Sequence, residues 1–222
     1  MSATSSPVTA EHFQYLAART PGDDAFLEDL KREAIAAGIP PIWISPEQAS
    51  LMQVLLKLRR SREVVEVGTL AGYSAIVAAR ALPADGRVRT IELSAVHADF
   101  AEAWIARSDV AGRVEVHRGR GMDVLPTFAS DSADACFLDA DKSSYRAYLD
   151  ECMRILRPGG MVLVDNAFAF GQLLDAEPTD PEVNAVREFN DYVPTVDGLH
   201  AVIVPIGDGL WVGVKTDGAG PA

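Results

Sequence analysis

The chain has 222 residues, with 20 Lys and Arg against 32 Asp and Glu, and a formal net charge of −12. This length predicts one domain with a sizeable core, and 48 % hydrophobic with 23 % charged residues is globular composition, not that of a disordered or fibrous chain. The negative charge argues against nucleic acid or an anionic membrane as a partner. Cys136 and Cys152 form no disulfide framework, and neither a signal peptide nor a membrane-spanning run is found, so a cytoplasmic protein is expected.

The N-terminal part differs in pattern from the rest of the chain. Residues 1–9 are predicted to be disordered. Residues 10–58 predict helices that are interrupted at Pro21-Gly22 and at Pro40-Pro41. This helical segment is expected either to form a lid over the site of its own chain or to pack across the two-fold axis of a homodimer. Residues 59–222 are predicted to form the core domain.

Strands and helices are predicted to alternate from Val64 onward. Short β-branched apolar runs are followed there by longer segments of helical period, the pattern of a doubly wound α/β domain with helices on both faces of a mostly parallel sheet. The expected strands are residues 63–68, 88–93, 114–119, 133–139 and 161–165, and the expected helices are residues 72–81, 95–107, 122–128, 145–156 and 181–192. Pro158-Gly159-Gly160 is expected to end the fourth of these helices before the fifth strand.

The end of the chain predicts a hairpin. Two apolar runs, residues 200–206 and 210–215, are joined by Gly207-Asp208-Gly209. Such a turn between apolar runs favours a pair of antiparallel strands. The sheet is therefore expected to finish differently from a plain dinucleotide-binding Rossmann fold, whose last strands are parallel.

A glycine-rich turn follows the first predicted strand. Gly68 and Gly72 lie in a G-x-x-x-G pattern that opens a helix at the carboxyl end of a strand, where nucleotide-like ligands bind in such sheets. The pattern is not the G-x-G-x-x-G pyrophosphate fingerprint. Glu92 ends the second strand, where a carboxylate can accept hydrogen bonds from both hydroxyls of a ribose. A purely structural turn remains the alternative.

Acidic and amide side chains end two later strands. Asp139 ends the fourth predicted strand, Asp165 ends the fifth, and Asn166 follows it. Because neighbouring parallel strands bring their carboxyl ends together, these side chains are expected to converge. Two carboxylates and one amide oxygen suit Mg²⁺ or Ca²⁺ and do not suit a structural Zn²⁺. The alternative is that both aspartates are ordinary helix caps or strand-end carboxylates.

Several segments together resemble a known family. EVGTLAGYSA, TIEL, FLDADKSSY, RPGGMVLVDNAFAFG and PIGDGL are similar, in order and spacing, to the cation-dependent O-methyltransferases of the caffeoyl-CoA and catechol type, over about Ile39 to Lys215. This resemblance implies a Rossmann-like class I methyltransferase fold that binds S-adenosylmethionine (SAM), with a seven-stranded sheet that ends in the antiparallel hairpin. Members of this family are usually homodimers, so a homodimer is expected.

The resemblance also implies roles for single residues. The cofactor positions of the family fall on Ile44, Glu66, Gly68, Thr69, Ser74, Glu92, Gly121 and Asp141. Its metal ligands fall on Asp139, Asp165 and Asn166, which would hold Mg²⁺, Mn²⁺ or Ca²⁺. Its proposed general base falls on Lys142. A solvated lysine at the start of a helix is the ordinary alternative for Lys142.

One loop departs from the family pattern. Many members read D-N-x-L-W-x-G, with a Trp that packs on an aromatic substrate, and Ala169 stands at the Trp position here. A wider pocket is expected, with Phe168 or Phe170 as a replacement wall and Trp43 as a wall from the lid side, although Trp43 fits a core position equally well. This favours a bulkier catechol or vicinal diol, such as a bacterial secondary metabolite, over a flat caffeoyl-type substrate. The tyrosines at 145 and 148 are expected only to pack.

Three functions follow from these residues. The leading one is a Mg²⁺-dependent O-methyltransferase that moves a methyl group from SAM to a hydroxyl of a catechol-like or vicinal-diol small molecule. The second is a methyltransferase that acts on RNA or protein, which the acidic chain and the lack of an N-P-P-Y type loop disfavour. The third is a SAM-binding module without catalysis, which the retained acidic and lysine residues disfavour. The sequence does not identify the acceptor or the position that is methylated.

Overall fold

Seven strands form a single sheet in the computed structural model, which describes residues 8–216. Residues 1–7 of the stretch expected to be disordered lie outside the described residues. The order across the sheet is β3-β2-β1-β4-β5-β7-β6. The strands are β1 (Glu63–Val67), β2 (Arg87–Glu92), β3 (Val114–Arg118), β4 (Ala133–Leu138), β5 (Leu156–Val164), β6 (Leu199–Val204) and β7 (Leu210–Lys215).

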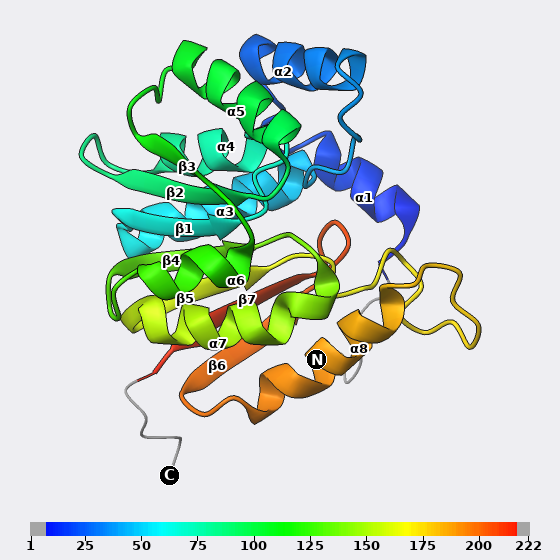
Figure 1. The fold of residues 1–222 in the computed structure, drawn as a ribbon. Coiled ribbons are helices and arrows are strands. Elements are labelled where there is room, and N and C mark those ends of the chain that lie inside the picture. Colours follow the sequence, from blue (N-terminus) through cyan, green and yellow to red (C-terminus); the bar gives the residue numbers. More distant parts are fainter. Residues whose placement is uncertain (1–7, 217–222) are drawn as a thin grey trace.

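The first five strands pair in parallel, and β7 runs antiparallel to both β5 and β6. The predicted seven-stranded, mostly parallel sheet with an antiparallel hairpin at its end is confirmed. Because β7 is antiparallel to β5, the start of β7 pairs with the end of β5, as Trp211 does with Val164. The turn that joins β6 to β7 therefore lies at the same edge of the sheet as the carboxyl ends of the parallel strands (Figure 1).

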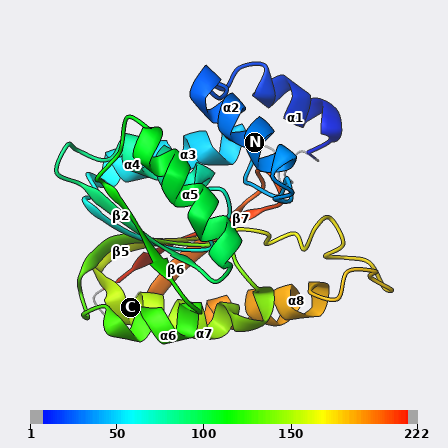
Figure 2. The same cartoon turned by 45° about the horizontal axis from the view of Figure 1, so that its top comes forward.

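Helices cover both faces of the sheet, as Figure 1 shows, and the rotated view in Figure 2 separates the two layers. On one face lie α2 (Ala25–Ala36), α3 (Pro46–Arg59), α4 (Tyr73–Ala81) and α5 (Ala95–Arg107), with α1 (Ala10–Ala17) at the edge of this layer. On the other face lie α6 (Gly121–Val124), α7 (Tyr145–Ile155) and α8 (Val183–Tyr192). Short 3₁₀ turns are η1 (Leu125–Thr127), η2 (Lys142–Ser144) and η3 (Val193–Thr195).

The two layers enclose two apolar cores because strand side chains alternate between the faces. Val64 belongs to the core under α3 and α4, whereas the next residue, Val65, belongs to the core under α7 and α8. In β4, Phe137 packs into the first core and Cys136 into the second. A strand buried on both faces reads as a continuous apolar run, which is why the sequence marks these strands clearly.

The start of β5 differs from the prediction. The helix before it ends at Ile155, and β5 begins at once with Leu156, so Pro158-Gly159-Gly160 lies inside the strand and does not separate helix from strand. The strand is irregular there: Gly159 has a φ of +74°, and the pairing of β4 with β5 shifts register nearby. Arg59 Nε, at the end of α3, donates a 2.7 Å hydrogen bond to the Gly159 carbonyl and holds this irregular start.

No helix within residues 8–216 combines the length and apolar character that crossing a bilayer requires.

Candidate functional site

The turn between β1 and α4 lies closely against the end of β4. Gly68 has a φ of +103°, and a Cβ atom there would overlap the backbone carbonyl oxygen of Asp139. Gly72 precedes the first residue of α4 with a φ of +85°, also in the left-handed region. Glycine is therefore required at 68 for both its backbone conformation and its lack of a side chain.

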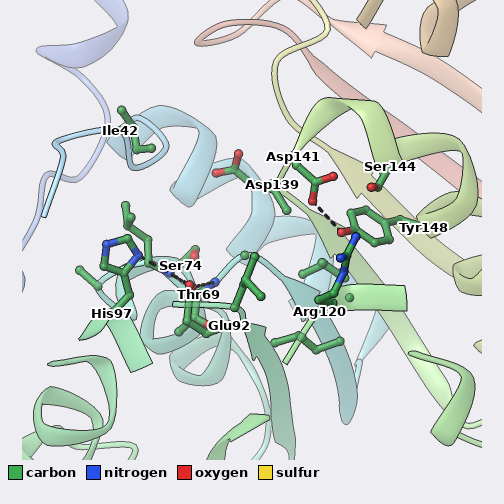
Figure 3. Close-up of a pocket in the computed structure, with 18 of the residues that line it drawn as sticks. Ile42, Thr69, Ser74, Glu92, His97, Arg120, Asp139, Asp141, Ser144 and Tyr148 are labelled. Carbon is green, nitrogen blue, oxygen red and sulfur yellow. Dashed lines mark hydrogen bonds and ion pairs between the residues drawn. The ribbon is translucent and has the colours of Figure 1, made fainter. Parts of the chain in front are cut away.

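Glu92, at the end of β2, fixes the shape of this turn. Its Oε2 accepts hydrogen bonds from the backbone nitrogens of Thr69 (3.2 Å) and Leu70 (2.8 Å), and its Oε1 accepts one from the Ser94 nitrogen (2.8 Å). The Glu92 side chain is almost fully buried. Figure 3 shows Glu92 and Thr69 together at one end of the pocket. A carboxylate that accepts several backbone hydrogen bonds orders the loop that donates them.

Glu66 lies beneath the turn rather than on its surface. It is 1 % exposed, and its Oε2 accepts a 2.5 Å hydrogen bond from Thr90 Oγ1. The Thr90 and Thr69 hydroxyl oxygens are 2.6 Å apart, so a short chain of hydrogen bonds joins Glu66 to the turn. Burial raises the pKa of Glu66 to about 7, although hydrogen bonds from Ser74 and Thr90 oppose this effect.

A cavity of about 510 Å³ opens at the carboxyl ends of β1, β2 and β4 (Figure 3). All of the predicted cofactor residues except Glu66 line it: Ile44, Gly68, Thr69, Ser74, Glu92, Gly121 and Asp141. Of the predicted metal ligands, Asp139 lines the same cavity, whereas Asp165 and Asn166 do not. The volume suits a small-molecule ligand.

Tyr148, on α7, contributes to this cavity in a way that the sequence analysis missed. Its hydroxyl donates a 2.7 Å hydrogen bond to Asp141 Oδ1, and its ring is part of the wall (Figure 3). A Cβ atom at Gly121 would lie 2.5 Å from the ring, so glycine leaves the room that the ring needs. Burial and the bond to Asp141 raise the pKa of Tyr148 to about 12. The tyrosine therefore does more than pack.

The segment before α3 closes the cavity from the lid side. Trp43 and Ile44 line it, as expected for a lid. Lys31 Nζ, on α2, lies 3.7 Å from the ring centroid of Tyr73 and 5.5 Å from that of Trp43. Asp23 accepts hydrogen bonds from Lys31 Nζ (2.5 Å) and from the Tyr73 hydroxyl (2.7 Å). Helix α2 and the residue pair of Lys31 and Asp23 thus contact two side chains of the cavity wall.

The two predicted acidic ligands lie at the tips of neighbouring parallel strands. Asp139 follows β4, Asp165 follows β5, and the Asp165 nitrogen donates to the Leu138 carbonyl at 3.0 Å. Asp165 is 5 % exposed, and burial followed by the charge of Asp139 raises its pKa to about 7. Gln48 Nε2 donates a 2.5 Å hydrogen bond to Asp165 Oδ1. Two carboxylates whose negative charges repel each other are stabilised by a cation between them, so the donor set fits a divalent ion.

Asn166, the third predicted ligand, is held by the turn between β6 and β7. Its Nδ2 donates a 3.0 Å hydrogen bond to Asp208 Oδ2, which leaves its amide oxygen available as a ligand. Within residues 8–216 no group of three or more His, Cys, Asp or Glu side chains lies close enough together to hold a metal ion. The predicted set contains only two such side chains, since its third donor is an amide.

Lys142, the predicted base, is buried beside Asp139. It is 6 % exposed, and its Nζ donates to Asp139 Oδ1 at 3.3 Å and to the Tyr145 hydroxyl at 2.7 Å. The alternative of a solvated helix-start lysine does not match this burial. Burial and nearby carboxylates raise the pKa of Tyr145 well above its ordinary value, so its hydroxyl stays neutral. Nothing in the sequence marks Tyr145 as a partner of Lys142.

The predicted substrate residues lie in different environments. Trp43 is on the wall of the cofactor cavity. Ala169 is fully buried with Val183 and Val186 in a small satellite core. Phe168 packs against Gly209, because a Cβ atom at residue 209 would lie 2.8 Å from the Phe168 ring. Phe170 is 38 % exposed, and its ring centroid is 5.9 Å from Lys142 Nζ. Phe170 is thus the exposed aromatic residue beside Lys142.

Gln48 and Asp208 touch the predicted metal ligands, and the sequence analysis did not single out either as a site residue. Gln48 also caps α3, because its Oε1 accepts from the Ser45 nitrogen at 3.1 Å. Asp208 lies in a Gly-Asp-Gly turn. Both residues have an ordinary local role that accounts for them in the sequence, so nothing there pointed to their contacts across the fold.

Comparison with known proteins agrees with this arrangement. A family model described as O-methyltransferase matches residues 17–216. The chain is 37 % identical over 196 residues to catechol O-methyltransferase of Niastella koreensis. This match covers 87 % of this chain and 86 % of that protein. It is also 37 % identical over 183 residues to catechol O-methyltransferase of Mycobacterium tuberculosis, with 82 % and 83 % covered.

Solved structures agree as well. The O-methyltransferase from Bacillus cereus in complex with SAH superposes with a TM-score of 0.83 at 32 % identity, covering 92 % of this chain and 96 % of that chain. The O-methyltransferase TomG from Streptomyces achromogenes, involved in tomaymycin synthesis and in complex with SAM, gives a TM-score of 0.82 at 31 % identity, covering 93 % and 96 %.

Proposed function

Because the chain belongs to the O-methyltransferase family, we propose that it methylates one hydroxyl of a catechol-like or vicinal-diol small molecule in a reaction that requires a divalent cation, with Mg²⁺ preferred over Mn²⁺ or Ca²⁺. The chain is a SAM-dependent O-methyltransferase. The proposal adds to this the class of the acceptor, the cation and the residues that act. The observation that carries it is that Asp139 and the buried Asp165 end neighbouring strands, with Asp139 also lining the cavity of the proposed cofactor residues.

SAM is proposed to bind in the cavity between the glycine-rich turn and the lid. Glu92 at the end of β2 is the residue for the ribose hydroxyls, and the turn from Gly68 to Ser74 approaches the rest of the molecule with its backbone. Asp141 and Tyr148 form the opposite wall. The complexes of two similar proteins, with SAH and with SAM, support this assignment.

The cation is proposed to bind Asp139, Asp165 and the amide oxygen of Asn166. When bound, it supplies Lewis-acid stabilisation of an ionised acceptor hydroxyl and holds two vicinal oxygens in place. Gln48 occupies one oxygen of Asp165, and Lys142 approaches one oxygen of Asp139, so each carboxylate keeps a second oxygen for the ion. Burial and the negative charge of Asp139 raise the pKa of Asp165 to about 7, and the positive charge of Lys142 offsets this only in part.

Lys142 is proposed as the general base. In its neutral amine form, its Nζ would take the proton from the acceptor hydroxyl, the acceptor oxygen would attack the methyl carbon of SAM, and the bond from that carbon to sulfur would break to give SAH. The Tyr145 hydroxyl and Asp139 fix the position of Nζ. SAM supplies an already activated methyl group, so the protein has only to align and deprotonate the acceptor.

The acceptor class is supported by similarity and by the loop after β5. Two relatives at 37 % identity are named catechol O-methyltransferase, and TomG is described as involved in tomaymycin synthesis. Phe170 is proposed as the aromatic wall of the acceptor site, since it is exposed beside Lys142. A bacterial secondary metabolite with adjacent hydroxyls fits this setting. The homodimer and the cytoplasmic location remain predictions.

The test is a methyl-transfer assay on a panel from catechol and caffeic acid to large polyketide diols, with EDTA and with added Mg²⁺. We expect turnover of at least one catechol or diol, its loss with EDTA and its return with Mg²⁺. Asp165→Ala should remove metal-dependent turnover and leave SAM affinity within about tenfold, because the ion anchors the acceptor more than the sulfonium. Turnover that survives EDTA would contradict the cation, and methylation of RNA or protein alone would contradict the acceptor class.

A further inference from the structure

We propose that Asp208, in the turn between β6 and β7, is a positioning residue that sets the Asn166 amide for the divalent cation and holds the loop that follows β5. This inference rests on the proposed metal site and adds a residue outside the predicted set of ligands. Figure 1 shows the β6–β7 turn and the loop after β5 on the same side of the sheet. Three hydrogen bonds to one carboxylate connect them.

The first of these contacts determines which end of the Asn166 amide faces the proposed cation. Asn166 Nδ2 donates to Asp208 Oδ2 at 3.0 Å. An ionised carboxylate can only accept hydrogen bonds, so it selects the amide nitrogen and leaves the amide oxygen on the other side. A ligand that must present oxygen to a hard cation needs this orientation, and outer partners of this kind tune metal affinity.

The other two contacts hold a backbone conformation that side-chain-bearing residues rarely adopt. Asn166, Ala169 and Phe170 have φ values of 66°, 53° and 59°. Non-glycine residues in this region are strained and persist only where their surroundings fix them. Asp208 Oδ2 accepts from the Phe170 nitrogen at 2.8 Å, and Oδ1 accepts from the Gly171 nitrogen at 3.1 Å.

The backbone of the same turn adds further contacts. The Phe168 nitrogen donates to the Asp208 carbonyl at 2.8 Å, and the Ala167 nitrogen donates to the Gly209 carbonyl at 2.9 Å. A Cβ atom at Gly207 would overlap the side chain of Gln48, the residue that bonds to Asp165. The turn thus packs between α3 and the loop that follows β5. Its one charged side chain, Asp208, reaches the proposed ligand Asn166.

The test measures Mn²⁺ binding to the full chain without acceptor, by electron paramagnetic resonance of the free ion. Asp208→Asn should weaken Mn²⁺ affinity at least tenfold, the range seen when outer partners of metal ligands are removed, and leave SAM affinity within about twofold. The matched control is Asp134→Asn. Asp134 accepts from the nitrogens of Arg62 and Glu63 and from Arg157, but it lies at the opposite end of β4. The control should leave Mn²⁺ affinity unchanged.

A second variant background separates the orientation of the Asn166 amide from a general loosening of the loop after β5. In a chain that carries Asn166→Asp, the new carboxylate would face the carboxylate of Asp208. Adding Asp208→Asn removes this repulsion and should therefore strengthen Mn²⁺ binding instead of weakening it. Asp208→Asn that lowers Mn²⁺ affinity equally in both backgrounds, or not at all, overturns the positioning role alone. If the unaltered chain binds no Mn²⁺, both this inference and the proposed cation are wrong.

Discussion

Gln48 Nε2 lies 2.5 Å from Asp165 Oδ1 and joins the first turn of α3 to the tip of β5. The bond is buried, since Gln48 is 3 % exposed and Asp165 is 5 % exposed. Trp43 and Ile44, which precede α3, line the cofactor cavity. One side chain therefore connects the helix that follows the proposed lid to a proposed metal ligand.

Gln48→Leu removes this bond at similar volume. A hydrogen bond to a charged group contributes about 1.5–3 kcal/mol, so kcat/KM should fall on the order of tenfold or more, with SAM affinity within about threefold. The control is Ser45→Ala, which removes the other half of the α3 cap and leaves the bond to Asp165 intact. Steady-state kinetics and SAM titration of both variants make the measurement, and equal losses in the two would show that only capping matters.

Gly68→Ala should destabilise the fold strongly, because its Cβ atom would overlap the backbone of Asp139. Gly112 is the matched control: its φ is +80°, but no atom lies within 4 Å of a Cβ atom there. Gly112→Ala should cost about 1–2 kcal/mol for the backbone conformation alone. Gly68→Ala should lower the free energy of unfolding by more than about 4 kcal/mol, as urea titration measures. Similar losses in the two variants would mean that the close contact is relieved by movement.

The two tyrosines of α7 should have separable effects. Tyr148→Phe removes the hydrogen bond to Asp141 on the cofactor wall and should weaken SAM binding about fivefold, for a loss of about 1 kcal/mol. Tyr145→Phe removes the partner of Lys142 Nζ and should lower kcat with little change in SAM affinity. Titration calorimetry and initial rates test this. If both variants lose SAM affinity alike, Tyr145 has been placed in the wrong half of the site.

Glu66 should make the stability depend on pH between about 4.5 and 7. Burial raises its pKa from 4.5 to about 7 in the folded chain, so the folded state keeps a proton that the unfolded state releases. Stability from this group is therefore complete below pH 4.5 and is lost as pH rises through 7. Glu66→Gln cannot ionise, so the free energy of unfolding of the variant relative to the unaltered chain should increase across this window.

Urea titrations of both chains at several pH values, in the presence of EDTA, measure that difference. Asp165 also has its pKa raised to about 7, so the unaltered chain and the variant share its contribution, and it cancels in the comparison. A difference that stays constant from pH 4.5 to 8 would show that folding does not raise the pKa of Glu66.

The elements that the sequence predicted well are those with a local signal. β4 is a continuous apolar run over residues 135–138 because this part is buried on both faces, and the hairpin is marked by its Gly-Asp-Gly turn. Asp139 and Asp165 could be paired from sequence because parallel strands bring their carboxyl ends to one edge. The same rule placed Glu92 beside the turn that contains Thr69, and their hydrogen bond is present.

What the sequence could not show are contacts between distant segments that have their own local explanation. Gln48 reads as a helix cap and Asp208 as a turn residue, and only the folded chain brings them to Asp165 and Asn166. Tyr148 reads as a core residue of an amphipathic helix, and its hydroxyl reaches Asp141 only because residue 121 is glycine.

The reversed direction of β7 has a consequence for the folding of the chain during its own translation. The cavity of the cofactor residues is lined entirely by residues between Ile42 and Tyr148, all of which leave the ribosome well before the hairpin does. Asn166 receives its partner only from Asp208, close to the end of the chain. The half of the site that is proposed to hold the methyl donor can therefore take shape on a growing chain, whereas the half that is proposed to hold the acceptor has to wait for the β6–β7 turn to be translated.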